Sequence, residues 1–399
     1  MTTFGQRVLL PGGGVTWTVL GADGLPHESY ERFLAHHRVV SAPNTVRAYA
    51  TSLGCFEVFL QQNGQCWDQI ARDDLANFVH WLRFGTTPDV LELTSRHEPA
   101  HGEATVELRM AAVVAFYEFM AEEGVGPALV LHRTARKRIG AGQPYKGMLH
   151  HLSSRRPQRT PVFRLRKRRR DRPPVLTPAQ VQAILDACAW WDAAAGTWRG
   201  SLRNRLLFAL LAETGMRLGE ALCLFHDDFV AGRGETPYVL VTPREHPHQQ
   251  RVKGWRCRRI YVSDRLEALH GDYLWEVCDR GGAEAVDNLG QWWLFVNVHR
   301  EPLFAAMRPE TVYDTVRRIK HRLGNRVPAG FSPHWLRHTH ATALLMSGAP
   351  LPLVQQRMGH ADVQTTINTY GWVTEDAALR ALAGWQSFAG GWAAASVAP

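Results

Sequence analysis

Residues 334–342 read HWLRHTHAT, a run in which histidines and an arginine recur at helical spacing. His334 and Arg337 are three residues apart and His338 is four residues from His334, so a helix places all three side chains on one face. Guanidinium and imidazole groups together can hold a phosphate and move protons. Taken alone, the run also fits a structural histidine beside a surface arginine, so its meaning depends on the residues around it.

A second run lies upstream, where residues 214–222 read TGMRLGEAL. A turn broken by Gly215 is expected to place Arg217 at the N-terminus of a helix. There the guanidinium fork and the exposed backbone N–H groups can both face a phosphate. The alternative interpretation is an exposed arginine that caps a turn.

A third run lies downstream. Residues 358–360 read MGH, and Tyr370 follows ten residues after His360. Alone, Tyr370 would most often be a half-buried aromatic residue. Lys253 lies earlier, in the RVKG of residues 251–254, between two expected strands. A lysine in a hairpin is usually just solvated, so its assignment depends on its place in the order, and Arg251 is the alternative.

Transfer of a phosphodiester without a metal ion needs a nucleophile, cations on the non-bridging oxygens, a proton acceptor and an acid for the leaving 5′-oxygen. In their joint order and spacing the three runs closely resemble the tyrosine recombinase (phage integrase) family. The resemblance covers roughly residues 27–385 and is specific over residues 210–225 and 331–374. The lead-in from Arg244 to Lys253 is also similar to that of transposon-borne members of the Tn554 transposase type.

The resemblance implies a role for each of six residues. Arg217 and Arg337 would hold the scissile phosphate, Lys253 would protonate the leaving 5′-oxygen, His334 would assist proton transfer from the nucleophile, His360 would hydrogen-bond the phosphate, and Tyr370 would attack it to form a 3′-phosphotyrosyl ester. His338 and Glu220 match family positions of a supportive kind. No metal ion, cofactor or ATP is expected.

Helical periodicity dominates the chain, so the expected fold is mainly α with a small β-sheet. We expect an arm over residues 1–26 with one short strand at 15–20, then a helical bundle over 27–125. A linker over 126–174 follows, and then a second domain over 175–399. By resemblance, the bundle is a SAM-like domain that binds the DNA core site, and the second domain is catalytic.

Elements within the two domains are expected from periodicity and capping residues. In the bundle we expect helices over 27–39, from a cap at Ser41 or Asn44, from Asp73, and over 103–122. In the second domain we expect a helix capped by Thr177, helices over 202–213 and from Leu218, and a hairpin of strands 238–241 and 259–262. A possible third strand at 292–296 precedes helices at 309–323, 334–346, 351–358, 364–370 and 375–385.

Positive charge is concentrated in the expected linker. The chain carries a net charge of +9, yet residues 132–172 hold 15 of its 46 Lys and Arg residues and one of its 37 acids. Such a segment cannot form its own core, and its natural partner is a polyanion such as double-stranded DNA. We expect DNA contacts from Arg166, Lys167, Arg168, Arg169 and Arg170. Arg47, on the helix after Asn44, is a further candidate, with an ordinary exposed arginine as the alternative.

Several classes of protein do not fit the sequence. The six cysteines show no C-x-x-C spacing and no zinc-like cluster with histidine, so no metal site is expected. The chain has no recognisable signal peptide and no apolar run of 18 residues, which favours a cytoplasmic, nucleoid-associated protein without a membrane span. The resemblance also implies a homo-tetramer on DNA that exchanges C-terminal segments.

Three functions remain open from the sequence. The first is an active site-specific recombinase that integrates, excises or transposes a mobile element. The second is an enzyme that resembles type IB topoisomerases or telomere resolvases, which share the chemistry. The third is a catalytically silent DNA-binding accessory protein, against which all six catalytic positions hold competent residues.

Overall fold

The computed structural model divides the chain into two compact units, residues 1–168 and 169–399, each of which is described by itself. The structure describes residues 5–11, 14–21, 23–85, 100–127, 129, 132–135, 158–161, 173–248, 250, 252, 257–360 and 363–370. Within these residues no helix is long and apolar enough to span a membrane.

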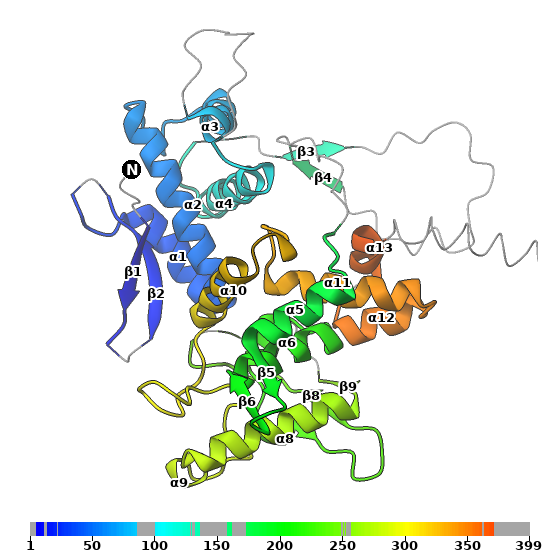
Figure 1. Ribbon diagram of the computed structural model, residues 1–399. Helices are drawn as coiled ribbons and strands as arrows, with labels where there is room; N and C mark the ends of the chain where they lie inside the picture. Colours follow the sequence, from blue (N-terminus) through cyan, green and yellow to red (C-terminus); the bar gives the residue numbers. More distant parts are fainter. Residues whose placement is uncertain are drawn as a thin grey trace, which may run out of the picture. The chain divides into compact units, whose positions relative to one another are not determined.

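Four helices form the body of the first unit (Figure 1): α1 (Glu28–Val40), α2 (Pro43–Gln62), α3 (Arg72–Phe84) and α4 (Glu103–Glu122). Their apolar faces meet in an aromatic core in which the rings of Phe56 and Phe78 lie 4.9 Å apart. The expected cap of the second helix was wrong. Ala42 is the N-cap and Pro43 occupies the first turn, where a fixed φ and a missing N–H cost nothing.

A hairpin packs against this bundle, formed by β1 (Gly5–Leu9) and β2 (Val15–Val19). The expected strand at 15–20 is present, but the sequence did not predict its partner β1. Val19 is fully buried against α1 and α2, and the Thr18 hydroxyl donates a 2.6 Å hydrogen bond to Glu31. A second antiparallel pair, β3 (His132–Ala135) and β4 (Gln158–Pro161), forms within the expected linker.

The second unit is mainly helical and contains a three-stranded antiparallel sheet in the order β7-β8-β9, formed by β7 (Phe229–Val230), β8 (Tyr238–Val241) and β9 (Arg258–Tyr261). A separate hairpin is formed by β5 (Ala189–Asp192) and β6 (Thr197–Gly200). Its helices are α5 (Pro178–Cys188), α6 (Leu202–Thr214), α7 (Leu218–Leu222), α8 (Asp264–Asp279), α9 (Gly282–Ala285), α10 (Pro309–Leu323), α11 (Pro333–Met346), α12 (Leu351–Met358) and α13 (Val363–Tyr370), with short 3-10 turns η1 (His226–Asp228) and η2 (Gly324–Arg326).

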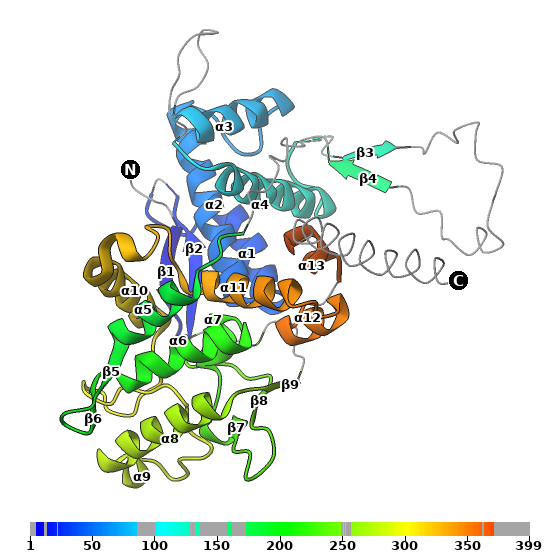
Figure 2. The same ribbon diagram turned by 45° about the vertical axis from the view of Figure 1, so that its right-hand side comes forward.

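Helix α6 lies at the centre of this unit and contacts α5, α8 and α11 (Figure 2). Apolar residues therefore face inward around most of its circumference, including Leu206, Phe208 and Leu210, each fully buried. Helices α10 and α12 begin and end at the residues expected from periodicity. Thr177 caps α5 as expected, accepting a hydrogen bond from the backbone of Gln180.

The strand expected at 292–296 was wrong, and β7 is the third strand instead. Leu294 bonds to Leu224 while Phe295 bonds to Met307, so successive residues pair with different segments and no ladder forms. The helix expected at 375–385 lies outside the described residues. Hairpin β5-β6 and helix α8 were not expected.

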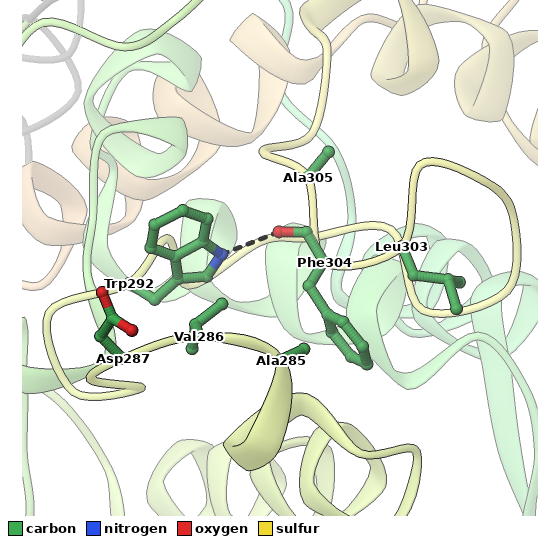
Figure 3. A pocket seen from close by; sticks show the side chains of 7 residues that line it. All are labelled: Ala285, Val286, Asp287, Trp292, Leu303, Phe304 and Ala305. Atoms are coloured by element: carbon green, nitrogen blue, oxygen red, sulfur yellow. Dashed lines mark hydrogen bonds between the residues drawn. The ribbon is translucent and has the colours of Figure 1, made fainter.

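A surface pocket of about 380 Å³ lies beside α9 (Figure 3). The indole N–H of Trp292 donates to the carbonyl of Phe304 at 2.8 Å and closes one side of it. Val286 and Leu303 contribute apolar walls. None of the pocket's lining residues belongs to the site predicted from the sequence.

Candidate active site

Arg217 is placed by the turn between α6 and α7. Gly215 ends α6 with φ +65°, and a Cβ there would lie 2.7 Å from the His340 ring. Arg217 is the N-cap of α7. Its backbone N–H and its Nη1 both donate to the Glu220 carboxylate, at 2.8 and 2.9 Å. The Arg217 side chain is 29% exposed.

Arg337, on α11, links the end of α6 to the end of α12. Its Nη1 donates to the carbonyl of Gly215 at 2.6 Å, and its Nη2 donates to the carbonyl of Met358 at 2.7 Å. The residue is only 3% exposed. Burial and then the charge of Arg217 lower the pKa of Arg337 to about 9, which leaves it a cation at neutral pH.

Tyr370, the last residue of α13, contacts His338 of α11. Nδ1 of His338 lies 2.8 Å from the tyrosine hydroxyl, and Tyr370 is 2% exposed. Burial raises the pKa of Tyr370 to about 12 against the opposing charges of Arg337 and Arg217. Burial, His334 and Arg337 lower the pKa of His338 to about 4. At neutral pH a protonated phenol therefore meets a neutral imidazole, to which it can donate.

Two further histidines complete the cluster. The ring of His334 lies 4.4 Å from that of His338, and its side chain is exposed. Partial desolvation and the charges of Arg337 and Arg217 lower its pKa. His360 follows α12, and its Nδ1 lies 2.8 Å from the hydroxyl of Thr366. Burial, Arg337 and Arg217 lower the pKa of His360 to about 4, so it is also neutral.

The structure thus gathers five of the six predicted residues in one place: Arg217, His334, Arg337, His360 and Tyr370. Lys253, its alternative Arg251 and the basic run from Arg166 to Arg170 lie outside the described residues. Arg47 is exposed on α2, with its guanidinium 5.0 Å from the centre of the Trp17 ring. Among the described residues, no three His, Cys, Asp or Glu side chains form a group that could hold a metal ion.

The sequence did not mark two features of the site. Arg258, at the start of β9, donates to Glu220 at 2.6 Å, but an arginine in a strand carries no distinguishing pattern. The tyrosine hydroxyl bonds to His338, whereas the resemblance had implied that His334 assists its proton transfer. Which imidazole reaches Tyr370 depends on where α13 packs, which helical spacing alone does not determine.

Known proteins share both halves of this architecture. Residues 174–376 match the phage integrase family, and residues 28–124 match the phage integrase N-terminal SAM-like domain. Transposase A from transposon Tn554 of Staphylococcus aureus is 32% identical over 331 residues, which is 82% of each chain. Tyrosine recombinase XerC of Roseiflexus sp. is 24% identical over 351 residues, covering 85% of this chain and 86% of that protein.

Solved structures show the same fold. The XerH site-specific recombinase, in a post-cleavage complex with its palindromic difH substrate, covers 90% of this chain and 85% of its own at 20% identity, with a TM-score of 0.57. The Tn1549 transposon integrase bound to a circular intermediate DNA covers 86% and 94% at 16% identity, with a TM-score of 0.54. With these matches over both units, the chain belongs to the phage integrase family and is a tyrosine site-specific recombinase.

Proposed function

We propose that this recombinase moves a mobile element by cutting and rejoining DNA strands through a covalent bond between Tyr370 and a 3′-phosphate. The contact between Tyr370 and His338, set beside two arginines, is the observation that carries the proposal. The transposase relative, similar over 82% of both chains, supports transposition as the setting.

The reaction follows from the charges and contacts of the site. Arg217 and Arg337 bind the non-bridging oxygens and offset the charge of the pentacoordinate phosphorus. The oxygen of Tyr370 attacks phosphorus as its proton passes to the neutral ring of His338, and the exposed His334 extends this pair toward solvent. The P–O bond to the 5′-oxygen breaks, and Lys253 supplies the proton that this oxygen takes. His360 donates a hydrogen bond to the phosphate.

The second strand transfer reverses these steps. A 5′-hydroxyl attacks the phosphotyrosyl ester and gives its proton to Lys253, the P–O bond to Tyr370 breaks, and His338 returns its proton to the tyrosine oxygen. Each phosphodiester bond that breaks is replaced by a phosphotyrosyl ester bond of similar energy, so the cycle needs no ATP. Neutral histidines suit both directions, because each must accept a proton in one step and release it in the other.

DNA is the partner that this chemistry requires. We place the core-binding function in residues 27–125, catalysis in 175–399 and a DNA-tracking role in the basic linker 126–174. Two solved structures with the same fold are DNA complexes, one of them with a palindromic substrate. A homo-tetramer on DNA that exchanges C-terminal segments, and a nucleoid-associated location in the cytoplasm, complete the proposal.

The nucleophile is tested by replacing Tyr370 with Phe, which removes one oxygen. The substrate is a nicked duplex built from the ends of the element that carries the gene, so that cleavage traps the protein on DNA. The wild type should form a covalent adduct, and Tyr370→Phe should form none while still binding DNA. Tyr313→Phe is the matched control, because Tyr313 is 51% exposed on α10. An adduct that persists in Tyr370→Phe refutes the proposal.

The linker is tested by salt dependence. Changing residues 166–170 together to Gln should weaken binding to specific and non-specific duplexes alike. The slope of log K against log salt should fall by up to about four units, because each lost phosphate contact removes about 0.9. Sequence preference should change little, since phosphate contacts position a protein without reading bases. An unchanged slope would show that the run does not lie on DNA.

A further inference from the structure

The C-terminal end of α12 gathers three arginines on consecutive carbonyl oxygens, those of residues 357–359. The first accepts from Nε of Arg258 at 3.2 Å, the second from Nη2 of Arg337 at 2.7 Å and the third from Nη1 of Arg217 at 3.3 Å. The last carbonyls of a helix lack intrahelical partners and form the negative end of its dipole, so cations stabilise them. Arg217 and Arg337 belong to the proposed phosphate site, whereas Arg258 is not one of the six residues assigned to it.

Arg258 and Arg217 share one carboxylate. Arg258 binds Glu220 with both terminal nitrogens, Nη2 at 2.6 Å and Nη1 at 3.3 Å, whereas the guanidinium of Arg217 binds it through Nη1 alone, at 2.9 Å. The Glu220 side chain is 1% exposed and that of Arg258 is 7% exposed, so this pair is buried. Burial raises the pKa of Glu220, but Arg258 and then Arg217 outweigh it and hold that pKa below its usual value. Glu220 is therefore an anion.

The division of contacts leaves Arg217 available. Among the described residues, only Nη1 of its guanidinium makes hydrogen bonds, so Nε and Nη2 remain for a ligand. An unshared carboxylate would bind a guanidinium through two parallel N–H bonds, which is the preferred geometry of this pair. Without Arg258, Glu220 would therefore draw a second nitrogen of Arg217 inward and neutralise its charge.

We infer that Arg258 is a positioning residue. It holds the Glu220 carboxylate so that Arg217 keeps the N–H groups of Nε and Nη2, and its charge, for the scissile phosphate. The inference rests on the proposed function of Arg217. It goes beyond the six residues implied by the family resemblance, because Arg258 acts on Arg217 through Glu220.

The backbone at Gly359 is shaped to admit Arg258. A Cβ at this position would lie 2.8 Å from Nη1 of Arg258, closer than real Cβ contacts come, and φ is +63°. Any other residue at 359 would push against the guanidinium or strain the backbone. The turn that leads into His360 therefore also fixes the position of the Arg258 guanidinium.

The experiment measures the rate of covalent adduct formation on the nicked duplex. Arg258→Met should react about 10- to 100-fold more slowly than wild type, which approaches the loss of a phosphate donor. Adding Glu220→Gln to Arg258→Met should restore about tenfold of that rate, since a neutral amide no longer competes for Arg217. Arg205→Met is the matched control. Arg205 is also buried, at 6% exposure, and pairs with Asp186, yet it should leave the rate near wild type.

A second substrate separates positioning from general damage. A methylphosphonate at the scissile position removes the negative charge that Arg217 meets, so Arg258→Met should lose far less rate relative to wild type on it. Arg258→Lys, which keeps the charge with single-point geometry, should fall between wild type and Arg258→Met, and serves if the methionine variant does not fold.

Each outcome decides the question. A wild-type rate in Arg258→Met, or in Arg258→Lys where the methionine variant does not fold, overturns the inference. A double variant as slow as the single variant, or an equal defect on both substrates, overturns it as well. Failure of the proposed function is distinguishable, because the wild-type protein itself would then form no adduct through Tyr370.

Discussion

Two groups of histidines in the second unit have lowered pKa values, and their contrast shows how the candidate site differs from the interior. The first group lies at the site and comprises His334, His338 and His360. The second lies around η1 and α8 and comprises His226, His246 and His270. Burial lowers the pKa to about 4 at five of the six, and lowers it at His334 too. A lowered pKa therefore does not separate the groups.

Charge and hydrogen bonding do separate them. Arg337 adds to the lowering of the pKa at every histidine of the site. In the other group, burial acts alone on His226, and other histidines supply the remainder. At the site, His338 bonds to Tyr370, whereas both ring nitrogens of His226 lack a hydrogen-bond partner among the described residues. A hydrogen bond to Tyr370, in addition to a nearby cation, sets the proposed catalytic residue His338 apart.

Replacing one histidine of each group tests this distinction most directly. His338→Phe removes the proposed proton acceptor and should slow adduct formation about 10²- to 10⁴-fold, the usual contribution of general acid–base catalysis. His226→Phe should keep the wild-type rate, because it removes only a buried imidazole without partners. Adduct assays on the nicked duplex, with melting temperatures as the folding control, measure both. Equal losses in the two variants would remove the distinction.

A smaller effect is expected on stability in acid. The folded-state pKa of His226 and His270 is about 4, below the ordinary value of 6.5, so their contribution is complete above pH 6.5. As pH falls from 6.5 toward 4, the unfolded chain takes up protons that the folded chain excludes. The free energy of unfolding should fall by up to about 1.4 kcal/mol per pH unit for each histidine.

Urea unfolding at pH 7, 6 and 5 tests this expectation. His226→Phe should give a shallower decline than wild type, because one of these imidazoles is gone. His321→Phe is the comparison variant, because His321 is exposed on α10 and its loss should leave the decline as steep as in wild type. A decline that is as steep in His226→Phe as in wild type would show that the interior histidines do not set it.

The smallest effect concerns a hydroxyl beside the site. Thr366 is fully buried and its Oγ1 lies 2.8 Å from His360, so it orients that ring. Thr366→Val should slow adduct formation about fivefold, in line with the loss of one neutral hydrogen bond. Thr342→Val is its control, because the Thr342 hydroxyl is buried without a hydrogen-bond partner among the described residues. That variant should react normally and be no less stable. A normal rate in Thr366→Val would exclude the orienting role.

How far the sequence predicts this molecule depends on how local each feature is. The bounds of α10 and α12 follow from apolar spacing, a proline in the first turn and a glycine at the C-cap, all within or next to the helix. Arg217 was expected at a helix N-terminus because the glycine that frees it is two residues away. The missed strand β1 pairs with β2 through alternation too weak to recognise. Residues 292–296 form an apolar run typical of a strand, but Trp293 and Val296 bridge to two different segments.

Contacts between distant residues account for the rest. Glu220 and Arg258 are 38 positions apart, and His338 and Tyr370 are 32 apart. Each of these residues has ordinary local neighbours, and its meaning comes only from the partner that folding supplies. The family resemblance implied the six proposed reacting groups, while the structure shows the contacts made by five of them.

The three arginines at the end of α12 also carry an energetic consequence. Bringing like charges together is unfavourable, and the lowering of the Arg337 pKa by Arg217 is a sign of that repulsion. The repulsion is overcome once, during folding, by Glu220 and the helix carbonyls. The proposed phosphate site therefore holds like charges together before any DNA is bound. A phosphate bound there would offset this repulsion and stabilise the protein, whatever base sequence surrounds it.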